Sequence, residues 1–232
     1  IIKRIPSNWR NFSKSQNHED LEAYESFFYG MTNGLVLETG GGEFSATVFF
    51  EKLFKWRAIH IEADPRVYKT LVKTRSNQIA IHAALCSSPR LVHFVPSHVQ
   101  AVGIWETMSA SFIELWHEDL KNDAKKVEAL PVVLCVTVTS VLRRLGLTHI
   151  NLWVLDTDGT EEDVLRGLNT SQVTVDVVAF QEEKPFDETH QAENERKVDI
   201  MREKKYNCGY YAHENRWCVR EGYKGLSIRG PR

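Results

Sequence analysis

The sequence lacks the features by which several classes of protein are recognised. No apolar run approaches the ~20 residues that a membrane-spanning helix requires, so we expect no membrane span in this segment. Lysine and arginine number 29 against 31 aspartates and glutamates, which argues against a nucleic-acid-binding protein that depends on bulk positive charge. Internal repeats and Pro/Gly/Ser-rich linkers are missing as well, which favours one α/β domain over two.

The motifs of several enzyme classes are missing too. None of HExxH, GxSxG and GxxxxGK occurs, so the sequence gives no signal for a zinc protease, a serine hydrolase or a P-loop nucleotide hydrolase. The nine histidines are scattered and form no ligand cluster. We therefore expect no bound metal, with one alternative at an acidic cluster that is described below.

Cysteine is scarce, and its four copies include no CxxC pair, which weakens zinc-ribbon and thioredoxin interpretations. Four buried free thiols and two disulfides both remain open, and Cys208–Cys218 is the first pair to suspect because these residues flank a predicted hairpin. Two Asn-x-Ser/Thr sequons occur, at Asn11 and Asn169. The compartment stays open, a secretory or organellar lumen included. A first residue other than Met leads us to expect a processed or trimmed segment.

Short apolar runs alternate with helix-like stretches along most of the chain. This alternation predicts a parallel sheet with helices on both faces. The strands are expected at 35–37, 58–61, 79–81, 150–155 and 175–180, and the helices at 46–54, 65–75, 140–145, 161–168 and 188–205.

Three further segments stand outside this alternation. Residues 18–29 predict an amphipathic helix before the first strand, and 97–129 a helix that covers one end of the sheet. Residues 206–212 and 217–220 predict an antiparallel hairpin at the C-terminal end. We thus expect an N-terminal segment and helix, 1–34, packed on a single domain, 35–232.

The first predicted strand ends in an acidic, glycine-rich loop. Gly40 and Gly42 allow a sharp turn and a close approach to a ligand, since no Cβ intervenes. Glu38 and Glu43 would repel a phosphate at the start of the next helix, so a ligand with a positive centre fits better. The loop follows the pattern acid-x-Gly-x-Gly-x-Gly, except that Phe44 replaces the last glycine and could obstruct the site.

The second predicted strand ends in Glu62, where an acidic residue can accept hydrogen bonds from both hydroxyls of a ribose. Together with the glycine loop, this describes a nucleoside that carries a cation and no pyrophosphate. S-adenosylmethionine is such a molecule. The competing interpretation is a plain tight turn with two solvated acids.

Five segments of the chain agree in order and spacing with one known family. They read GLVLETGGGEFSATVFFEK, FKWRAIHIEADP, IHAALCS, VVLCVTVTSVLRRLGLTHINLWVLDTDGTEEDVLRG and VDVVAFQEE. They resemble the FkbM family of S-adenosylmethionine-dependent methyltransferases, and SQNHED at 15–20 resembles a box of its eukaryotic branch. The resemblance implies a Rossmann-like, doubly wound, mostly parallel seven-stranded sheet. It also implies methyl transfer to a hydroxyl of a sugar or other small-molecule or glycan acceptor.

The resemblance also implies roles for single residues. Glu38, Gly40 and Gly42 would line the methionine side of the cofactor, and Glu62 would hold its ribose. His82 and Ala83 would lie near the adenine, and Asp156 would face the methyl group. The chain departs from the family pattern at Phe44 and at Asp158, where a glutamate is usual.

Carboxylates are concentrated after the fourth and fifth predicted strands. Residues 156–195 hold twelve acids against two bases. Asp156, Asp158 and Glu182 are the candidates for the base that takes the proton of an attacking hydroxyl, and the cluster would attract a cationic cofactor. Alternatively, Asp156, Asp158 and Glu161 could bind Mg²⁺ or Ca²⁺, while Glu162 and Asp163 suit helix capping or solvent.

The tail has the opposite charge, with eight bases against three acids in 202–232. It could dock an acidic protein partner or the chain's own acidic edge, or lie in solvent. Two functions therefore stand side by side. One is an O-directed methyltransferase, and the other is a catalytically degenerate relative that serves as a structural subunit of a larger assembly.

Overall fold

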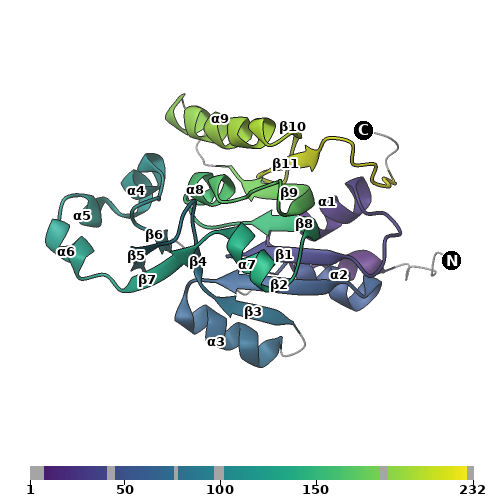
Figure 1. Cartoon of the computed structure of the whole chain (residues 1–232), viewed down its shortest axis with the longest axis horizontal. Helices are drawn as coiled ribbons and strands as arrows, with labels where there is room; N and C mark the ends of the chain where they lie inside the picture. Colours follow the sequence, from purple (N-terminus) through teal and green to yellow (C-terminus); the bar gives the residue numbers. More distant parts are fainter. Residues whose placement is uncertain (1–7, 41–44, 76–77, 97–101, 183–187, 229–232) are drawn as a thin grey trace.

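A seven-stranded sheet forms the centre of the computed structural model, which describes residues 8–40, 45–75, 78–96, 102–182 and 188–228 (Figure 1). Its strand order is β10-β11-β9-β8-β1-β2-β3. All neighbours are parallel except β11, which is antiparallel to both β9 and β10. The predicted α/β fold with an antiparallel C-terminal hairpin is confirmed. The strands are β1 (Leu35–Thr39), β2 (Arg57–Glu62), β3 (Ile79–His82), β8 (His149–Leu155), β9 (Thr174–Gln181), β10 (Tyr206–Ala212) and β11 (Asn215–Arg220).

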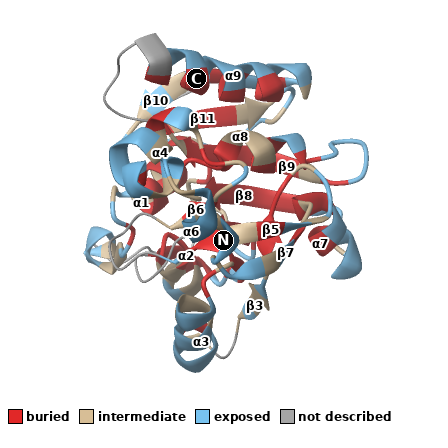
Figure 2. Cartoon of the chain, turned by 90° about the vertical axis from the view of Figure 1, so that its left-hand side faces the viewer, coloured by how far each residue is buried: buried red, intermediate tan, exposed pale blue. Residues whose placement is uncertain are grey.

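The central strands are near-continuously apolar because both faces of the sheet are covered. In β1, Leu37 lies in register with Ile59 and Trp153 and packs in one core cluster with them, whereas Val36 packs in a second cluster on the opposite face. Figure 2 shows these buried strands running through the middle of the molecule. Burial of each large apolar side chain contributes about 1.5–3 kcal/mol, so the sheet is the main source of stability.

Five of the helices have ends within two residues of the predicted ones, whereas the helix predicted over 18–29 spans 19–26 and so ends three residues early. The helices are α1 (Glu19–Ser26), α2 (Thr47–Phe54), α3 (Pro65–Thr74), α7 (Val138–Arg144), α8 (Glu161–Arg166) and α9 (Glu188–Glu203), with a 3₁₀ turn η1 (Trp9–Phe12). The side chains of helices α7, α8 and α9 belong to the core cluster on one face of the sheet, and those of α1 and α2 belong to the cluster on the other face. These helices therefore cover the two faces.

Helix α1 is held against the sheet by aromatic side chains. Tyr24 stacks on Phe54 of α2 with ring centroids 4.4 Å apart, and Phe27 stacks on Trp217 of β11 at 5.6 Å. The chain after β11 returns to the same place, where Ile228 N–H donates to the Glu25 carbonyl. The segment before β1 therefore packs on the sheet, and it is brought close to the carboxyl ends of the strands.

A second, four-stranded sheet of order β4-β7-β5-β6 was not predicted. Instead of one helix in 97–129, the structure has a strand and three short helices, and 97–101 lie outside the described residues (Figure 1). Asp123 ends any continuous helix, because its side chain accepts from the backbone N–H groups of Lys125 and Lys126 and so starts a new one. The elements are β4 (Ala84–Leu85), β5 (Arg90–Val95), β6 (Gly103–Ile104), β7 (Val132–Val136), α4 (Ala110–Trp116), α5 (Glu118–Lys121) and α6 (Ala124–Glu128).

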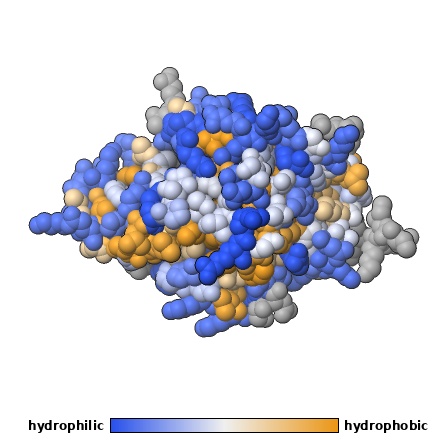
Figure 3. Space-filling model, in the orientation of Figure 1, coloured by the Kyte–Doolittle hydropathy of each residue, from blue (hydrophilic) through white to orange (hydrophobic). Residues whose placement is uncertain are grey.

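The outer face of this second sheet is apolar and exposed. Leu91 of β5 lies opposite Leu134 of β7, and both are more than half exposed, as is Val132. Figure 3 shows the hydrophobic area over β5 and β7. Because the outer face stays in solvent and two of the four strands have only two residues, the segment does not resemble the buried strands that the sequence reveals most clearly.

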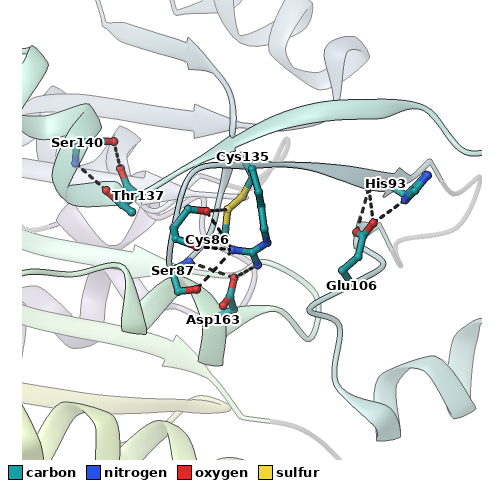
Figure 4. The surroundings of a disulfide bond; sticks show 10 residues. Cys86, Ser87, His93, Glu106, Cys135, Thr137, Ser140 and Asp163 are labelled. Carbon is teal, nitrogen blue, oxygen red and sulfur yellow. Dashed lines mark hydrogen bonds and ion pairs between the residues drawn. A yellow bond between two sulfur atoms is a disulfide. The ribbon is translucent and has the colours of Figure 1, made fainter.

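Both cysteine pairs form disulfides, so the interpretation as free thiols is wrong. Cys208–Cys218 joins the hairpin strands, as predicted. Cys86–Cys135 joins the end of β4 to β7 (Figure 4). Beside it, the Asp163 carboxylate accepts from the Ser87 N–H and lies 2.6 Å from Arg90, which ties α8 to the second sheet.

The length and apolarity needed to cross a bilayer are not found in any helix within the described ranges.

Candidate functional site

A cavity of about 500 Å³ opens at the carboxyl ends of β1, β2 and β8. The chain proceeds outward from β1 to β2 and β3 on one side and returns through β8 and β9 on the other, so the cavity lies where the strand order reverses. It is walled by the main sheet, by Phe94 and 102–104 of the second sheet, and by Ser15, Gln16 and Glu19. Of the nine predicted site residues, six line it: Glu38, Gly40, Glu62, Ala83, Asp156 and Asp158.

Gly40, directly after β1, lies against the backbone of Asp156, directly after β8. Its φ is +81°, and a Cβ placed on it would lie 1.7 Å from the backbone oxygen of Asp156. The Asp156 N–H donates to the Thr39 carbonyl at 3.0 Å, which fixes the two strand ends together. Glycine is required here both for the left-handed backbone and for the space. Gly42 and Phe44 lie outside the described residues.

Glu38 holds the start of α2 from the end of β1. Its buried carboxylate accepts from the Ala46 N–H at 2.7 Å and from the Ser45 hydroxyl. The ring of His60 lies 3.2 Å away. These contacts tie the end of β1 to the start of α2, so Glu38 positions this helix besides placing a carboxylate in the cavity wall.

Glu62, the last residue of β2, is 6% exposed and lines the cavity. It accepts from the Asp64 N–H at 2.7 Å, and no basic side chain of the described residues pairs with it. Burial raises the pKa of Glu62 to about 7, and the negative charges of Asp64 and Glu38 add to this effect. The nearby Arg66 is paired with Asp64 instead, at 2.7 Å.

Asp156 and Asp158 lie on the turn after β8. Burial raises the pKa of Asp156 well above its usual range, and the charges of Asp158 and Glu161 raise it further. Asp158 has a φ of +52°, uncommon for a residue with a side chain, and its carboxylate accepts from the Val102 N–H at 3.4 Å. The turn therefore connects the main sheet to the second sheet across the cavity.

The cavity wall is strongly negative. Its only basic residue among those described is Arg66. A cation is attracted to such a wall, and a phosphate is repelled. The carboxylates that line the cavity are Glu19, Glu38, Glu62, Asp64, Asp156 and Asp158.

Two predicted site residues lie elsewhere. Glu182 is buried beside Arg216, with 2.6 Å between its carboxylate and the Arg216 Nε, and it does not line the cavity. His82 is exposed, and its ring stacks on Tyr68 with centroids 5.0 Å apart.

Glu161, considered above as a cation ligand with Asp156 and Asp158, is engaged by other groups. Its carboxylate accepts from the Thr157 N–H at 2.8 Å and lies 3.9 Å from the Lys197 ammonium. Of the flanking acids, Glu162 pairs with Arg166 and Arg196. Across the described ranges, no three His, Cys, Asp or Glu side chains are grouped as metal ligands.

Part of the basic C-terminal segment binds the chain's own acidic edge. Arg216 pairs with Glu182, and Arg220 lies 3.1 Å from Asp176 of β9. The expectation that this segment docks on the chain's own acidic edge is thus observed for Arg216, whereas Asp176 lies near the start of β9, away from that edge. An acidic protein partner remains a prediction for the rest of the segment.

Several residues that line the cavity were not predicted as site residues. Ser15, Gln16 and Glu19 reach it because the buried Asp20 carboxylate accepts from Ser13, Lys14 and Ser15 and so fixes the preceding turn. Asn215 of β11 also lines the cavity, and its side-chain amide donates to Glu19 at 3.3 Å. The box at 15–20 was the only available signal, and nothing in the sequence marked Asn215.

A family model, the methyltransferase FkbM domain, matches residues 27–210. No curated protein sequence matches the chain significantly. Among solved structures, an archaeal fibrillarin pre-rRNA processing protein from Methanococcus jannaschii is similar with a TM-score of 0.45 and 11% identity over 90% of this chain and 77% of that one. A precorrin-6y C5,15-methyltransferase from Geobacter metallireducens gives 0.41 and 11%, covering 88% and 85%. A SAM-dependent methyltransferase from Aquifex aeolicus gives 0.41 and 10%, covering 94% and 97%.

Proposed function

Because the chain belongs to the FkbM methyltransferase family, we propose that it transfers a methyl group from S-adenosylmethionine to a hydroxyl of a sugar or another small acceptor. The observation that carries this proposal is the acidic cavity at the reversal of strand order, in which Glu62 has no basic partner among the described residues. We further propose that the chain belongs to the family's eukaryotic branch, which its residues 15–20 resemble.

The residues of the cavity fit the cofactor by chemistry and by space. Glu62, ionised, would accept hydrogen bonds from both ribose hydroxyls, and Ala83 would face the adenine. Gly40, which lines the cavity against the Asp156 backbone, would lie beside the methionine part of the cofactor. The sulfonium would be attracted by Glu38 and Asp156, since the only basic residue in the described part of the wall, Arg66, is paired with Asp64.

The carboxylates at the end of β8 would handle the proton of the reaction. When bound, S-adenosylmethionine supplies an electrophilic methyl carbon. Methylation of a hydroxyl oxygen would require that a group of the chain take up the hydroxyl proton. Asp156 would take it, since its raised pKa makes its carboxylate a stronger base than a solvated one. Asp158 would orient the acceptor beside it. Glu182, predicted as a third candidate, is paired with Arg216 and has no part in this proposal.

The acceptor would bind on the side of the cavity away from β2. The second sheet contributes Phe94 and Ile104 there, and the N-terminal segment contributes Gln16. These residues combine apolar contact with a hydrogen-bonding amide, which suits a neutral hydroxyl-bearing acceptor. A negatively charged acceptor would be repelled by Asp156 and Asp158.

Calorimetric titration with S-adenosylmethionine and S-adenosylhomocysteine tests the proposal. We expect micromolar binding by the wild type and a 10- to 100-fold loss in Glu62→Ala, because each hydrogen bond to a charged group contributes about 1.5–3 kcal/mol. Glu162→Gln is the matched control, because Glu162 lies at the same edge of the sheet but outside the cavity. Absence of binding at millimolar ligand would contradict the enzyme and favour the catalytically degenerate subunit.

A further inference from the structure

The turn between α8 and β9 carries the tripeptide Asn169-Thr170-Ser171, and all three residues are exposed. The Asn169 side-chain oxygen accepts from the Ser171 N–H at 3.0 Å and from its hydroxyl at 2.7 Å. The Asn169 side-chain nitrogen forms no hydrogen bond to any described residue, whereas the backbone N–H donates to Thr139. The turn therefore engages the oxygen of the carboxamide and leaves its nitrogen directed at no neighbour within the described structure.

The cysteines supply an independent observation. All four form disulfides, and the two pairs lie in different parts of the fold, one in the second sheet and one in the C-terminal hairpin. Disulfides form and persist in oxidising compartments and are rare where thiols are kept reduced. The eukaryotic compartment in which disulfides form is also the one in which Asn-x-Ser/Thr sequons receive sugars.

The surroundings of Asn169 suit a sugar. Asn169 lies at the edge of a shallow hollow of about 370 Å³ whose other walls include Ser87, Ser140, Arg143 and Gln172. Hydroxyl, guanidinium and amide groups are those that hydrogen-bond to sugar hydroxyls. Figure 4 shows Ser87 and Ser140 on the same side of the Cys86–Cys135 disulfide, with His93 on the opposite side. No residue of this hollow lines the cofactor cavity, so a glycan here leaves the cavity open.

We propose that Asn169 is an N-glycosylation site, modified when the chain enters the compartment in which its disulfides form. The reaction joins the Asn169 amide nitrogen to the anomeric carbon of a sugar supplied by a lipid-linked oligosaccharide pyrophosphate. The bond from that carbon to the phosphate oxygen breaks, the lipid pyrophosphate leaves with the electron pair, and the amide loses one proton. No oxidation or reduction takes place.

The test uses the full chain behind a cleavable secretion signal in eukaryotic cells, with Asn11→Gln as the common background so that only one sequon remains. Intact mass is measured before and after treatment with a peptide-N-glycosidase, followed by peptide mapping. We expect one glycan-sized loss of mass and conversion of Asn169 to aspartate. Asn169→Gln and Ser171→Ala should show neither change. Thr170→Ala is the matched control, because it alters the same turn and preserves the sequon, and it should behave as the parent.

An unmodified Asn169 in protein that carries both disulfides would overturn the proposal. The same holds for a glycan that persists in Asn169→Gln. If a variant is retained in the cell, the retained fraction is digested and mapped in the same way, so that a failure of secretion does not conceal the result. Cofactor titration of the deglycosylated parent should give unchanged affinity, which separates this modification from the proposed function.

Discussion

Two neighbouring stretches of one sheet edge hold buried carboxylates in opposite circumstances. Directly after β9, the Glu182 carboxylate is paired with Arg216 of the adjacent hairpin strand β11. Beyond β2 and β8, Glu62 and Asp156 have raised pKa values, because they are buried and face other acids. Paired carboxylates hold strands together, whereas those left unneutralised store an unfavourable interaction that a cationic ligand can relieve. We therefore propose that the second stretch binds the ligand and that the first holds the strands together.

Removing a paired carboxylate gives the largest expected effect. Glu182→Ala leaves the Arg216 guanidinium partly buried without its partner, so the free energy of unfolding should fall by about 3 kcal/mol. Chemical denaturation measures this loss. Cofactor affinity at a temperature where the variant is folded should change less than threefold, because Glu182 does not line the cavity. If Glu182→Ala were as stable as the wild type, the paired carboxylate would not stabilise the fold, and the distinction between paired and unneutralised carboxylates would be wrong.

Removing the charge of an unneutralised carboxylate should increase the free energy of unfolding, whereas removing a paired carboxylate decreases it. The pKa of Glu62 is about 7 in the folded chain against 4.5 without the fold, so the folded state holds a proton that the unfolded state has lost. The free energy of unfolding of the wild type should therefore decrease as pH rises from about 4.5 to about 7.

Glu62→Gln escapes this cost, and at pH 8 it should be more stable than the wild type by about 2 kcal/mol, with little difference at pH 4.5. Thermal unfolding at both pH values measures the effect. Glu162→Gln, which removes a charge that is already paired, should show no such gain. If Glu62→Gln were less stable than the wild type at pH 8, the ionised carboxylate would have a stabilising partner. That result would contradict the statement that Glu62 is unneutralised.

Sequence patterns located most elements of the main sheet because its central strands are buried on both faces and its helices have clear starts, such as Pro65 after Asp64. These patterns did not predict the second sheet, because β4 and β6 have two residues each and the outer face of β5 and β7 is exposed. Continuous apolar runs reveal buried strands and do not reveal these.

The candidate site divides in the same way. Glycine spacing and acids at strand ends selected Glu38, Gly40 and Glu62 from local sequence. Glu182 looked equivalent to Asp156, because each follows a buried strand. They differ through Arg216, which lies 34 residues further along the chain and reaches Glu182 only because β11 pairs with β9. Local sequence cannot show which acid has been neutralised by a distant base.

The most direct test of the unneutralised carboxylate is the exchange of protons when the cofactor binds. Calorimetric titration of S-adenosylmethionine at pH 7, in two buffers of different ionisation enthalpy, counts the protons released. If ribose hydroxyls bind the ionised form of Glu62, the wild type should release a fraction of one proton, and its affinity should rise several-fold between pH 6 and pH 8. Glu62→Gln should abolish the part of both effects that belongs to this group. Binding with equal proton release and equal affinity in wild type and Glu62→Gln would contradict the account.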